Sequence, residues 1–179
     1  MDITEDSNKK IILTESINTK KSRAIITSKK WDKLIKTNAD YSHQEQYSAI
    51  TSFEKNENPS TPMHDCMIHE LQKKIGGYKT QDVHKRLFDP NKFVNLEDVI
   101  HLLYDCKMRC YYCKKDVHVL YEIVREVSQW TLDRLDNKYG HNRDNVVIAC
   151  LKCNLNRKTM YHERYAFTRT FTLVKKMDG

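Results

Sequence analysis

A pair of C-x2-C motifs constrains this chain more than any other feature. Cys110 and Cys113 form the first motif, Cys150 and Cys153 form the second, and 36 residues separate them. Four thiolates in two such pairs are the ligand set that closes a tetrahedral structural zinc site. A simple zinc ribbon separates its two pairs by only about 15–20 residues. The spacing therefore predicts a zinc-ordered module with room for a strand and a hairpin between the pairs.

Charge and hydropathy restrict the kind of partner and the compartment. Among 179 residues, 31 Lys and Arg stand against 24 Asp and Glu, which gives a net charge of +7 and favours a polyanionic partner. No apolar run approaches the roughly 20 residues that span a bilayer. The first ten residues are polar and acidic, unlike a signal peptide. We therefore expect an intracellular protein of the cytoplasm or nucleus, with cysteines that bind metal rather than form disulfides.

The chain has two further cysteines, and the four motif cysteines have an alternative to zinc binding. The alternative is a set of redox-active or unligated thiols, but nothing thioredoxin-like surrounds either motif. Cys66 and Cys106 lie outside the two motifs, and four ligands already complete a zinc site. We expect both to be buried thiols.

The segment between the motifs predicts a β-hairpin. Residues 129–149 contain two alternating apolar runs around a polar loop with Gly140. Before it, residues 117–127 are rich in β-branched side chains and predict a strand. After the second motif we expect one helix from Asn154 to about Tyr165. Residues 166–179 have no decisive pattern.

The first 60 residues carry few structural signals and are expected to form a basic, flexible arm. Seven basic residues lie between Lys20 and Lys36, against the single acid Asp32. The arm is either solvated and partly disordered or a contact for phosphates. Residues 56–62 contain two prolines among small polar residues and predict a linker.

Three helices are predicted between residues 61 and 105. The first starts with Thr61 as N-cap and Pro62 at the first helical position, and the pair Gly76-Gly77 is expected to end it. The second is expected over residues 80–88. The third is capped by Asn95, with Asp98 three residues on, and its apolar face comprises Leu96, Val99, Ile100, Leu103 and Tyr104. These helices should form a small bundle against the zinc module of residues 106–165, which a C-terminal extension of residues 166–179 follows.

The motif order Cys-x2-Cys, Leu-Asp-Arg, Gly-His, Asp-Asn-Val-Val, Cys-x2-Cys-Asn-x3-Lys resembles the HNH nucleases of the ββα-metal (His-Me finger) class. The four-cysteine subclass that includes the recombination endonuclease VII type is the most similar. The resemblance covers about residues 106–165. It implies an α+β fold, with a ββα-metal zinc module behind the N-terminal helical region. It also implies DNA as partner, structural Zn²⁺, and hydrolysis of phosphodiester bonds with Mg²⁺ or Mn²⁺.

The resemblance also implies a catalytic site. The family's ion ligands correspond to Asp133 and Asn154, whose oxygen atoms suit Mg²⁺ or Mn²⁺. Without the resemblance, Asp133 could instead pair with Arg134 or Arg143, and Asn154 could cap a helix. In the family, the residue after the aspartate is usually a histidine that acts as the general base. Here Arg134 follows Asp133, and arginine cannot accept a proton from water. Arg134 is then expected to stabilise phosphate charge.

His141 is the candidate for the missing general base, since an ordinary histidine pKa suits that role. The alternative is a loop residue that hydrogen-bonds the backbone. Asn145 corresponds to the family's asparagine that orders the hairpin loop and takes no direct part in the chemistry.

The segment that follows the second motif is strongly basic. Residues 151–176 carry seven Lys and Arg against Glu163 alone, and we expect Lys152, Arg157 and Lys158 to contact phosphates. A solvated charged face is the alternative.

Together with the resemblance, the sequence predicts an HNH-like endonuclease. Its rivals are a catalytically impaired descendant that still binds DNA, and a zinc-ribbon module that binds proteins.

Overall fold

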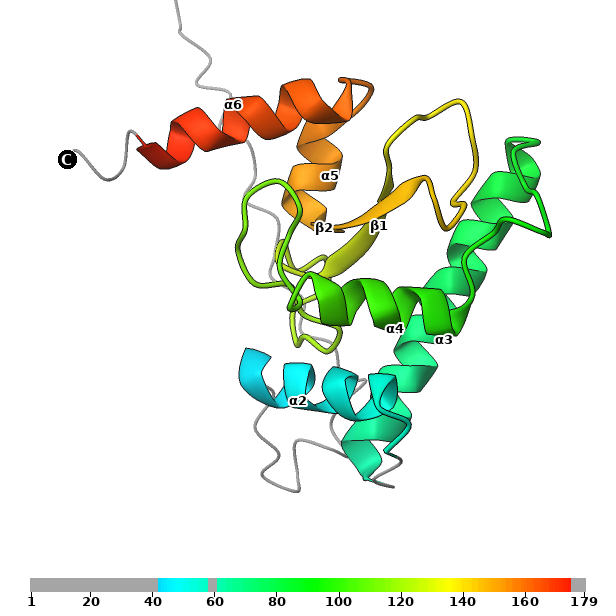
Figure 1. Cartoon of the computed structure of the whole chain (residues 1–179), viewed down its shortest axis with the longest axis vertical. Coiled ribbons are helices and arrows are strands. Elements are labelled where there is room, and N and C mark those ends of the chain that lie inside the picture. Colours follow the sequence, from blue (N-terminus) through cyan, green and yellow to red (C-terminus); the bar gives the residue numbers. More distant parts are fainter. Residues whose placement is uncertain (1–41, 58–60, 175–179) are drawn as a thin grey trace, which may run out of the picture.

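The computed structural model describes residues 42–57 and 61–174. Its elements are α2 (His43–Glu54), α3 (Pro62–His84), α4 (Leu96–Asp105), β1 (Trp130–Arg134), β2 (Val146–Cys150), α5 (Leu151–Arg157) and α6 (His162–Val174). Helices surround one small sheet, with α2 and α4 on one side and α5 and α6 on the other (Figure 1). The predicted α+β class is confirmed. Most of the expected N-terminal arm, residues 1–41, and residues 58–60 of the expected linker lie outside the described residues.

The sheet is an antiparallel hairpin that begins and ends beside the second cysteine motif. Trp130 pairs with Cys150 and Arg134 pairs with Val146, so the register covers both five-residue strands. Trp130, Leu132 and Ile148 are buried in the common core with Val99 and Leu103 of α4. Because β2 runs without a break into α5, the hairpin fixes where that helix starts. The predicted hairpin is confirmed.

The cap of α4 agrees with the sequence in detail. The Asn95 side chain accepts a hydrogen bond from the Asp98 backbone, and the Asp98 carboxylate accepts one from the Asn95 backbone. This capping box satisfies two N–H groups that a helix start leaves without partners. Val99, Ile100 and Leu103 then bury the apolar face, as predicted.

Helix α3 starts as expected but does not end at Gly76-Gly77. Thr61 caps it and Pro62 occupies the first turn. It continues through both glycines to His84, so the separate helix predicted over residues 80–88 is wrong. A glycine in a helix costs only about 1 kcal/mol relative to alanine. Tertiary contacts on both sides, through buried Leu71 before the glycines and buried Tyr78 after them, outweigh that cost.

Helix α2 lies inside the segment that was expected to be an arm. Ser42 caps it, since its side chain accepts a hydrogen bond from the Glu45 backbone. Its buried residues include Ala49, Ile50 and the polar Gln46. The helix packs beside α4, so the folded unit begins well before Thr61 (Figure 1).

The strand predicted over residues 117–127 is absent from the structure. Gln46 of α2 supplies the hydrogen bonds that a neighbouring strand would have made. Its amide oxygen accepts from the backbone of Val119 at 2.9 Å and of Leu120 at 3.0 Å, and its nitrogen donates to the Leu120 carbonyl. The β-branched Val117 and Val119 are buried in irregular backbone. Their composition therefore reflects burial rather than sheet pairing.

The single helix predicted after Cys153 is two helices. Lys158 has a positive φ of 53° and ends α5. The Arg157 side chain stabilises the turn by donating to the Met160 carbonyl at 2.6 Å. Helix α6 then starts at His162 and covers most of the undecided tail. None of the helices among residues 42–57 and 61–174 combines the length and apolar character needed to span a bilayer.

Candidate functional site

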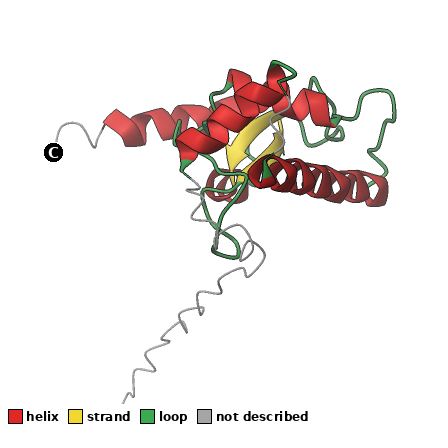
Figure 2. Cartoon of the chain, turned by 90° about the horizontal axis from the view of Figure 1, so that it is seen from below, coloured by secondary structure: helices red, strands yellow, loops and turns green. Residues whose placement is uncertain are grey.

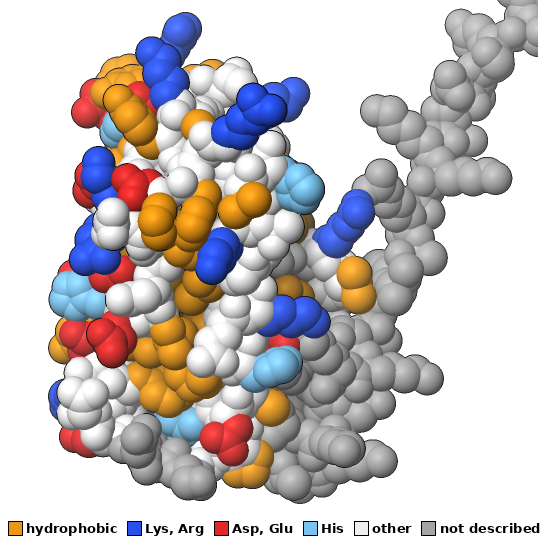
Figure 3. All heavy atoms as spheres, turned by 90° about the vertical axis from the view of Figure 1, so that its right-hand side faces the viewer, with side chains coloured by type: hydrophobic (Ala, Val, Ile, Leu, Met, Phe, Trp, Pro, Cys, Tyr) orange, Lys and Arg blue, Asp and Glu red, His pale blue; other side chains and the backbone are white. Residues whose placement is uncertain are grey.

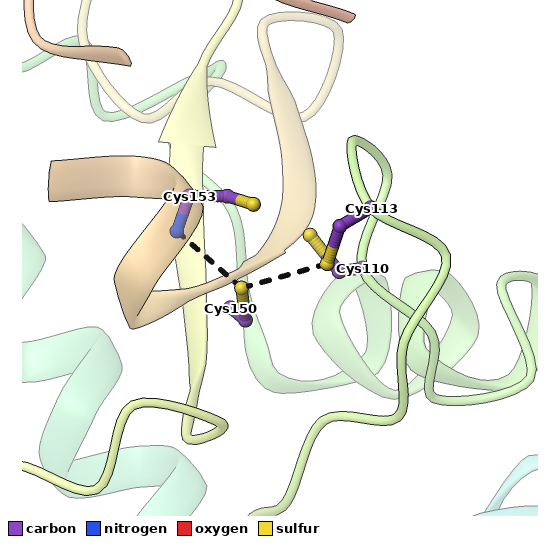
Figure 4. Close-up of side chains that lie close together, drawn as sticks. All are labelled: Cys110, Cys113, Cys150 and Cys153. Carbon is purple, nitrogen blue, oxygen red and sulfur yellow. Dashed lines mark hydrogen bonds between the residues drawn. The ribbon is translucent and has the colours of Figure 1, made fainter. Parts of the chain in front are cut away.

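The four cysteines of the two motifs converge on one point (Figure 4). Their sulfur atoms all lie within 4.8 Å of one another, and all four residues are buried. The Cys113 and Cys150 sulfurs are 3.9 Å apart. A tetrahedral zinc ion with Zn–S bonds of about 2.3 Å places its sulfurs about 3.8 Å apart. The cluster can therefore hold a metal ion such as zinc, as the sequence predicted.

A turn and a helix start direct the four cysteine sulfurs toward one another. The first motif lies in a tight turn, where the Cys110 backbone accepts from Lys114 at 2.9 Å and donates to the Lys115 carbonyl at 2.8 Å. Lys114 takes a positive φ of 57° there. Cys150 is the N-cap of α5, and its sulfur accepts a hydrogen bond from the Cys153 backbone at 3.4 Å. The hairpin brings these two pieces together.

The electrostatics of the cluster favour a cation. Hydrogen bonds from its neighbours, Cys110 first, lower the pKa of Cys113, whereas those with Cys110 and Cys113 raise the pKa of Cys150 and of Cys153. Four thiolates this close repel one another. Without a metal ion, some of the cysteines therefore keep their protons while others lose them. A dication removes the conflict by stabilising all four thiolates. The donor set and spacing fit structural zinc rather than Mg²⁺, which prefers oxygen.

Asp133, the expected ligand of a catalytic ion, lies in a buried ion pair with Arg157. The Asp133 Oδ2 atom accepts from Arg157 Nε at 2.6 Å, and Oδ1 accepts from Nη2 at 2.7 Å. The Tyr112 hydroxyl also donates to Oδ2, at 2.7 Å. The side chains of Asp133 and Arg157 are only 5% and 2% exposed. The partner of Asp133 is therefore neither Arg134 nor Arg143, the two considered from sequence.

The rest of the Arg157 guanidinium is also occupied. It donates to the carbonyl oxygens of Arg134 at 2.7 Å and of Met160 at 2.6 Å. Burial alone would lower the pKa of Arg157, but the hydrogen bond and charge of Asp133 outweigh it and raise the pKa. Arg157 is thus permanently charged and enclosed. Its donors point into the protein, so the guanidinium that was expected to contact phosphates is occupied by protein acceptors in this arrangement.

Asn154 and Arg134 lie beside this pair in different settings. Asn154 is the fourth residue of α5 rather than its cap, which is Cys150. Its Nδ2 atom donates to Thr131 Oγ1 at 3.0 Å and to the Leu132 carbonyl at 3.2 Å, which ties α5 to β1. Arg134, at the end of β1, is half-exposed and donates to the Tyr139 carbonyl at 3.1 Å. Asp133, Arg134 and Asn154 are therefore neighbours on one hairpin and its helix.

His141 lies away from the Asp133 pair, against helix α3. Asp82 binds it twice, accepting from the His141 backbone N–H at 2.6 Å and from Nδ1 at 2.8 Å. The Tyr78 ring packs on the imidazole with centroids 4.5 Å apart. Burial lowers the pKa of His141, and the charge of Asp82 opposes that effect. His141 was the candidate general base, with a loop residue that bonds backbone as the alternative, and the structure shows a buried histidine held by a carboxylate from another element.

Asn145 crosses the hairpin loop. Its Nδ2 atom donates to the carbonyls of Asp136 at 2.9 Å and Gly140 at 3.0 Å, and its Oδ1 atom accepts from the Asp136 backbone at 2.9 Å. These bonds join both sides of the loop, as a loop-ordering asparagine would. Lys152 and Lys158 behave differently from Arg157, because both are exposed.

Three residues that shape the site were not found from sequence. Tyr112 lies inside the first cysteine motif, and nothing local indicates that its hydroxyl binds Asp133 on the hairpin. Asp82 and Tyr78 belong to α3, one turn apart, and only the long-range fold brings them to the hairpin.

For α2 a signal did exist, since Ser42 and Glu45 have the spacing of a capping box. Cys66 and Cys106 are half-buried and lie outside the cluster, and burial raises the pKa of Cys106.

Comparisons of the chain with protein-family models, curated proteins and solved structures gave no match. The HNH-like resemblance is therefore carried by the motifs quoted above.

Proposed function

We propose that this chain is a zinc-ordered, HNH-like module that binds nucleic acid through its phosphate backbone. The observation that carries the proposal is the charge on the surface beside the cysteine cluster. From residue 151 to 171, Lys152, Lys158 and Arg164 are exposed, and Glu163 is the single acid. By contrast, basic and acidic side chains are mixed on the face formed by α3 (Figure 3). A predominantly basic patch next to the four-cysteine cluster suits a polyanion.

Binding is favoured over hydrolysis because of the state of Asp133. A catalytic ion needs free carboxylate lone pairs, whereas Asp133 Oδ2 already accepts two hydrogen bonds and Oδ1 accepts one. The adjacent guanidinium of Arg157 carries a permanent charge that repels a dication. The resting arrangement therefore supports the DNA-binding descendant among the hypotheses raised by the sequence.

Zinc content and salt-dependent binding test the proposal together. One zinc per chain is expected by elemental analysis of unoxidised protein. The logarithm of duplex affinity should fall linearly with the logarithm of salt, with a slope of about 0.9 per phosphate neutralised. Lys152→Ala with Lys158→Ala should weaken binding to all sequences alike and reduce that slope by roughly 2. Lys73→Ala with Lys79→Ala, on α3, is the matched control. A salt-independent interaction would contradict the proposal and favour the protein-binding zinc ribbon.

The second candidate function is the endonuclease itself. Its support is the placement of Asp133 and Asn154, because the Asn154 side chain reaches the carbonyl of the residue before Asp133. Hydrolysis would require Arg157 to leave Asp133 and admit Mg²⁺ or Mn²⁺, with Arg134 beside the phosphate. A base contributes typically about 10²–10⁴-fold, so cleavage without one should be slow. Slow Mn²⁺-dependent cleavage that Asp133→Asn abolishes, and that Arg134→His accelerates, would establish this function. No cleavage by either the natural chain or Arg134→His would exclude it.

A further inference from the structure

Helix α6 exposes aromatic side chains on the face that points away from the protein. Phe167 and Phe171 are 64% and 59% exposed, and their rings meet edge to face with centroids 4.6 Å apart. Arg164 precedes Phe167 by three residues and is also exposed. Residues three and four apart share one side of a helix. Arg164, Phe167 and Phe171 therefore form one line, which we call the outer stripe.

The opposite face of α6 attaches it to the metal module. Tyr165 is buried, and its ring packs against Tyr112 with centroids 5.0 Å apart. The helix projects from the body in Figures 1 and 2. Because one face is anchored, the outer stripe is held in a fixed orientation toward solvent.

The surroundings of the outer stripe are positively charged. Arg164 lies within it, and Lys158 is exposed in the turn before the helix. Glu163 is the single acidic residue between residues 151 and 171. An apolar stripe with this charge bias attracts an occupant that is itself anionic and carries flat apolar groups.

We propose that the outer stripe binds unpaired bases of single-stranded nucleic acid, a proposal that rests on the proposed function. Every base has a π-face, and base–aromatic stacking combined with backbone contacts from cations is the usual way to hold a single strand. Phe167 and Phe171 are one helical turn apart, about 6 Å along the axis. Bases can therefore stack on the two rings while Arg164 and Lys158, on the N-terminal side of the stripe, contact the adjoining phosphates. The module then binds duplex through α5 and an adjacent unpaired segment through α6.

Two other occupants fit less well. A second copy of the chain is the first of them. Two phenyl side chains supply only roughly 300–500 Å², less than the roughly 800 Å² per partner of a stable interface. Residues 1–41 are the other possibility within the chain. They carry nine Lys and Arg against six Asp and Glu, the same sign as the stripe.

The test compares single-stranded and duplex binding by the full-length, zinc-loaded protein. Fluorescence anisotropy measures the affinity for labelled oligo-dT, for oligo-rU and for a matched duplex. Phe167→Ala with Phe171→Ala should lower the affinity for both single strands by about 10- to 100-fold and leave the affinity for duplex unchanged. Val83→Ala with Val127→Ala, which removes exposed apolar groups elsewhere, is the control and should change neither. Phe167→Trp should keep the single-strand affinity, and its tryptophan emission should be quenched when oligo-dT binds.

The outcomes separate this inference from the proposed function. Unchanged oligo-dT affinity in the double-alanine variant, with duplex binding intact, overturns the stripe as a stacking surface and leaves the proposed function standing. Absence of binding to any nucleic acid by the natural protein overturns both. Self-association that the double-alanine variant abolishes, seen by sedimentation, assigns the stripe to a second copy and also overturns the inference.

Discussion

Two carboxylates are buried around the hairpin, and they solve the same problem with different partners. Asp133 is 5% exposed and pairs with Arg157, whereas Asp82 is fully buried and binds His141. Neither charge can remain in a low-dielectric interior without compensation. Arginine carries a fixed charge at any working pH, but histidine changes its charge in the physiological range. The hairpin is therefore held at its helix side by a permanent ion pair and at its loop side by a pair that can respond to pH.

Their locations explain why the two pairs should fail separately. Asp133 and Arg157 join β1 to α5, close to the cysteine cluster. Asp82 and His141 join the hairpin loop to α3, which contributes no cysteine to the cluster. The first pair should depend on the metal and the second on the long helix.

Metal removal should have the largest effect and should act on the Asp133 pair first. Apparent binding energies of structural zinc sites are about 10–16 kcal/mol, so chelation should unfold α5 and release Arg157. Hydrogen exchange should then show loss of protection over residues 146–157 before residues 67–84. Equal loss in both segments would mean that the two pairs belong to one cooperative unit.

Arg157→Ala should be the most damaging single substitution at either pair. Breaking a buried ion pair costs about 3–5 kcal/mol, because the remaining charge has no partner. The free energy of unfolding from urea titration measures this loss. Lys158→Ala, one residue away and exposed, should change stability by no more than about 0.5 kcal/mol. A loss below that of Lys158→Ala would show that Asp133 finds other donors.

Asp82→Asn should cost less, about 1–3 kcal/mol. The neutral amide keeps the size of the side chain, but only its oxygen can accept, so one of the two His141 hydrogen bonds is lost. The effect should appear in urea titration together with faster hydrogen exchange in residues 136–145. Asp144→Asn, at an exposed loop position, serves as the control. An equal effect of both substitutions would argue that loop charge matters rather than the buried pair.

The smallest effect concerns pH and should separate the two pairs cleanly. Burial lowers the pKa of His141, so the unfolded chain binds a proton there more readily than the folded chain. The contribution of His141 to stability is therefore unaffected above the unfolded value of about 6.5 and falls as pH drops below it. Lys85 and Arg134 act in the same direction and Asp82 opposes them. NMR should show that the His141 imidazole stays neutral in the pH range where a free histidine becomes protonated. A protonated ring at pH 6.5 in the folded protein would contradict this.

Local signals predicted much of the fold. The Asn95 and Asp98 cap, the Thr61 cap and the hairpin all depend on neighbouring residues, and the sequence alone identified them. The cysteine cluster was also predictable, because its spacing encodes a metal site directly. The glycine pair in α3 is a false stop signal, since the cost of a glycine is small and the contacts that outweigh it come from other elements.

Features that depend on partners distant in sequence were not predictable. Nothing near Val119 shows that Gln46 from α2, more than 70 residues away, will occupy its backbone. Arg157 looked like a surface cation because it follows a basic motif, and its burial depends on how α5 meets β1. For the candidate site, the resemblance and the loop motif directed attention to Asp133 and His141, but they could not identify Arg157 and Asp82 as their partners.

Gly140 has a consequence for the order in which the chain folds. A Cβ atom there would lie 2.5 Å from the Leu87 carbonyl oxygen and 2.7 Å from Asp82 Oδ2, so the loop fits against the end of α3 with no room for a side chain. The two strands can meet through local contacts, but this close fit requires a segment more than 50 residues earlier in the chain. Contacts of such separation form late, after the entropy of closing a long loop has been overcome. The hairpin loop should therefore acquire its final shape as one of the last events of folding, with α3 as its template.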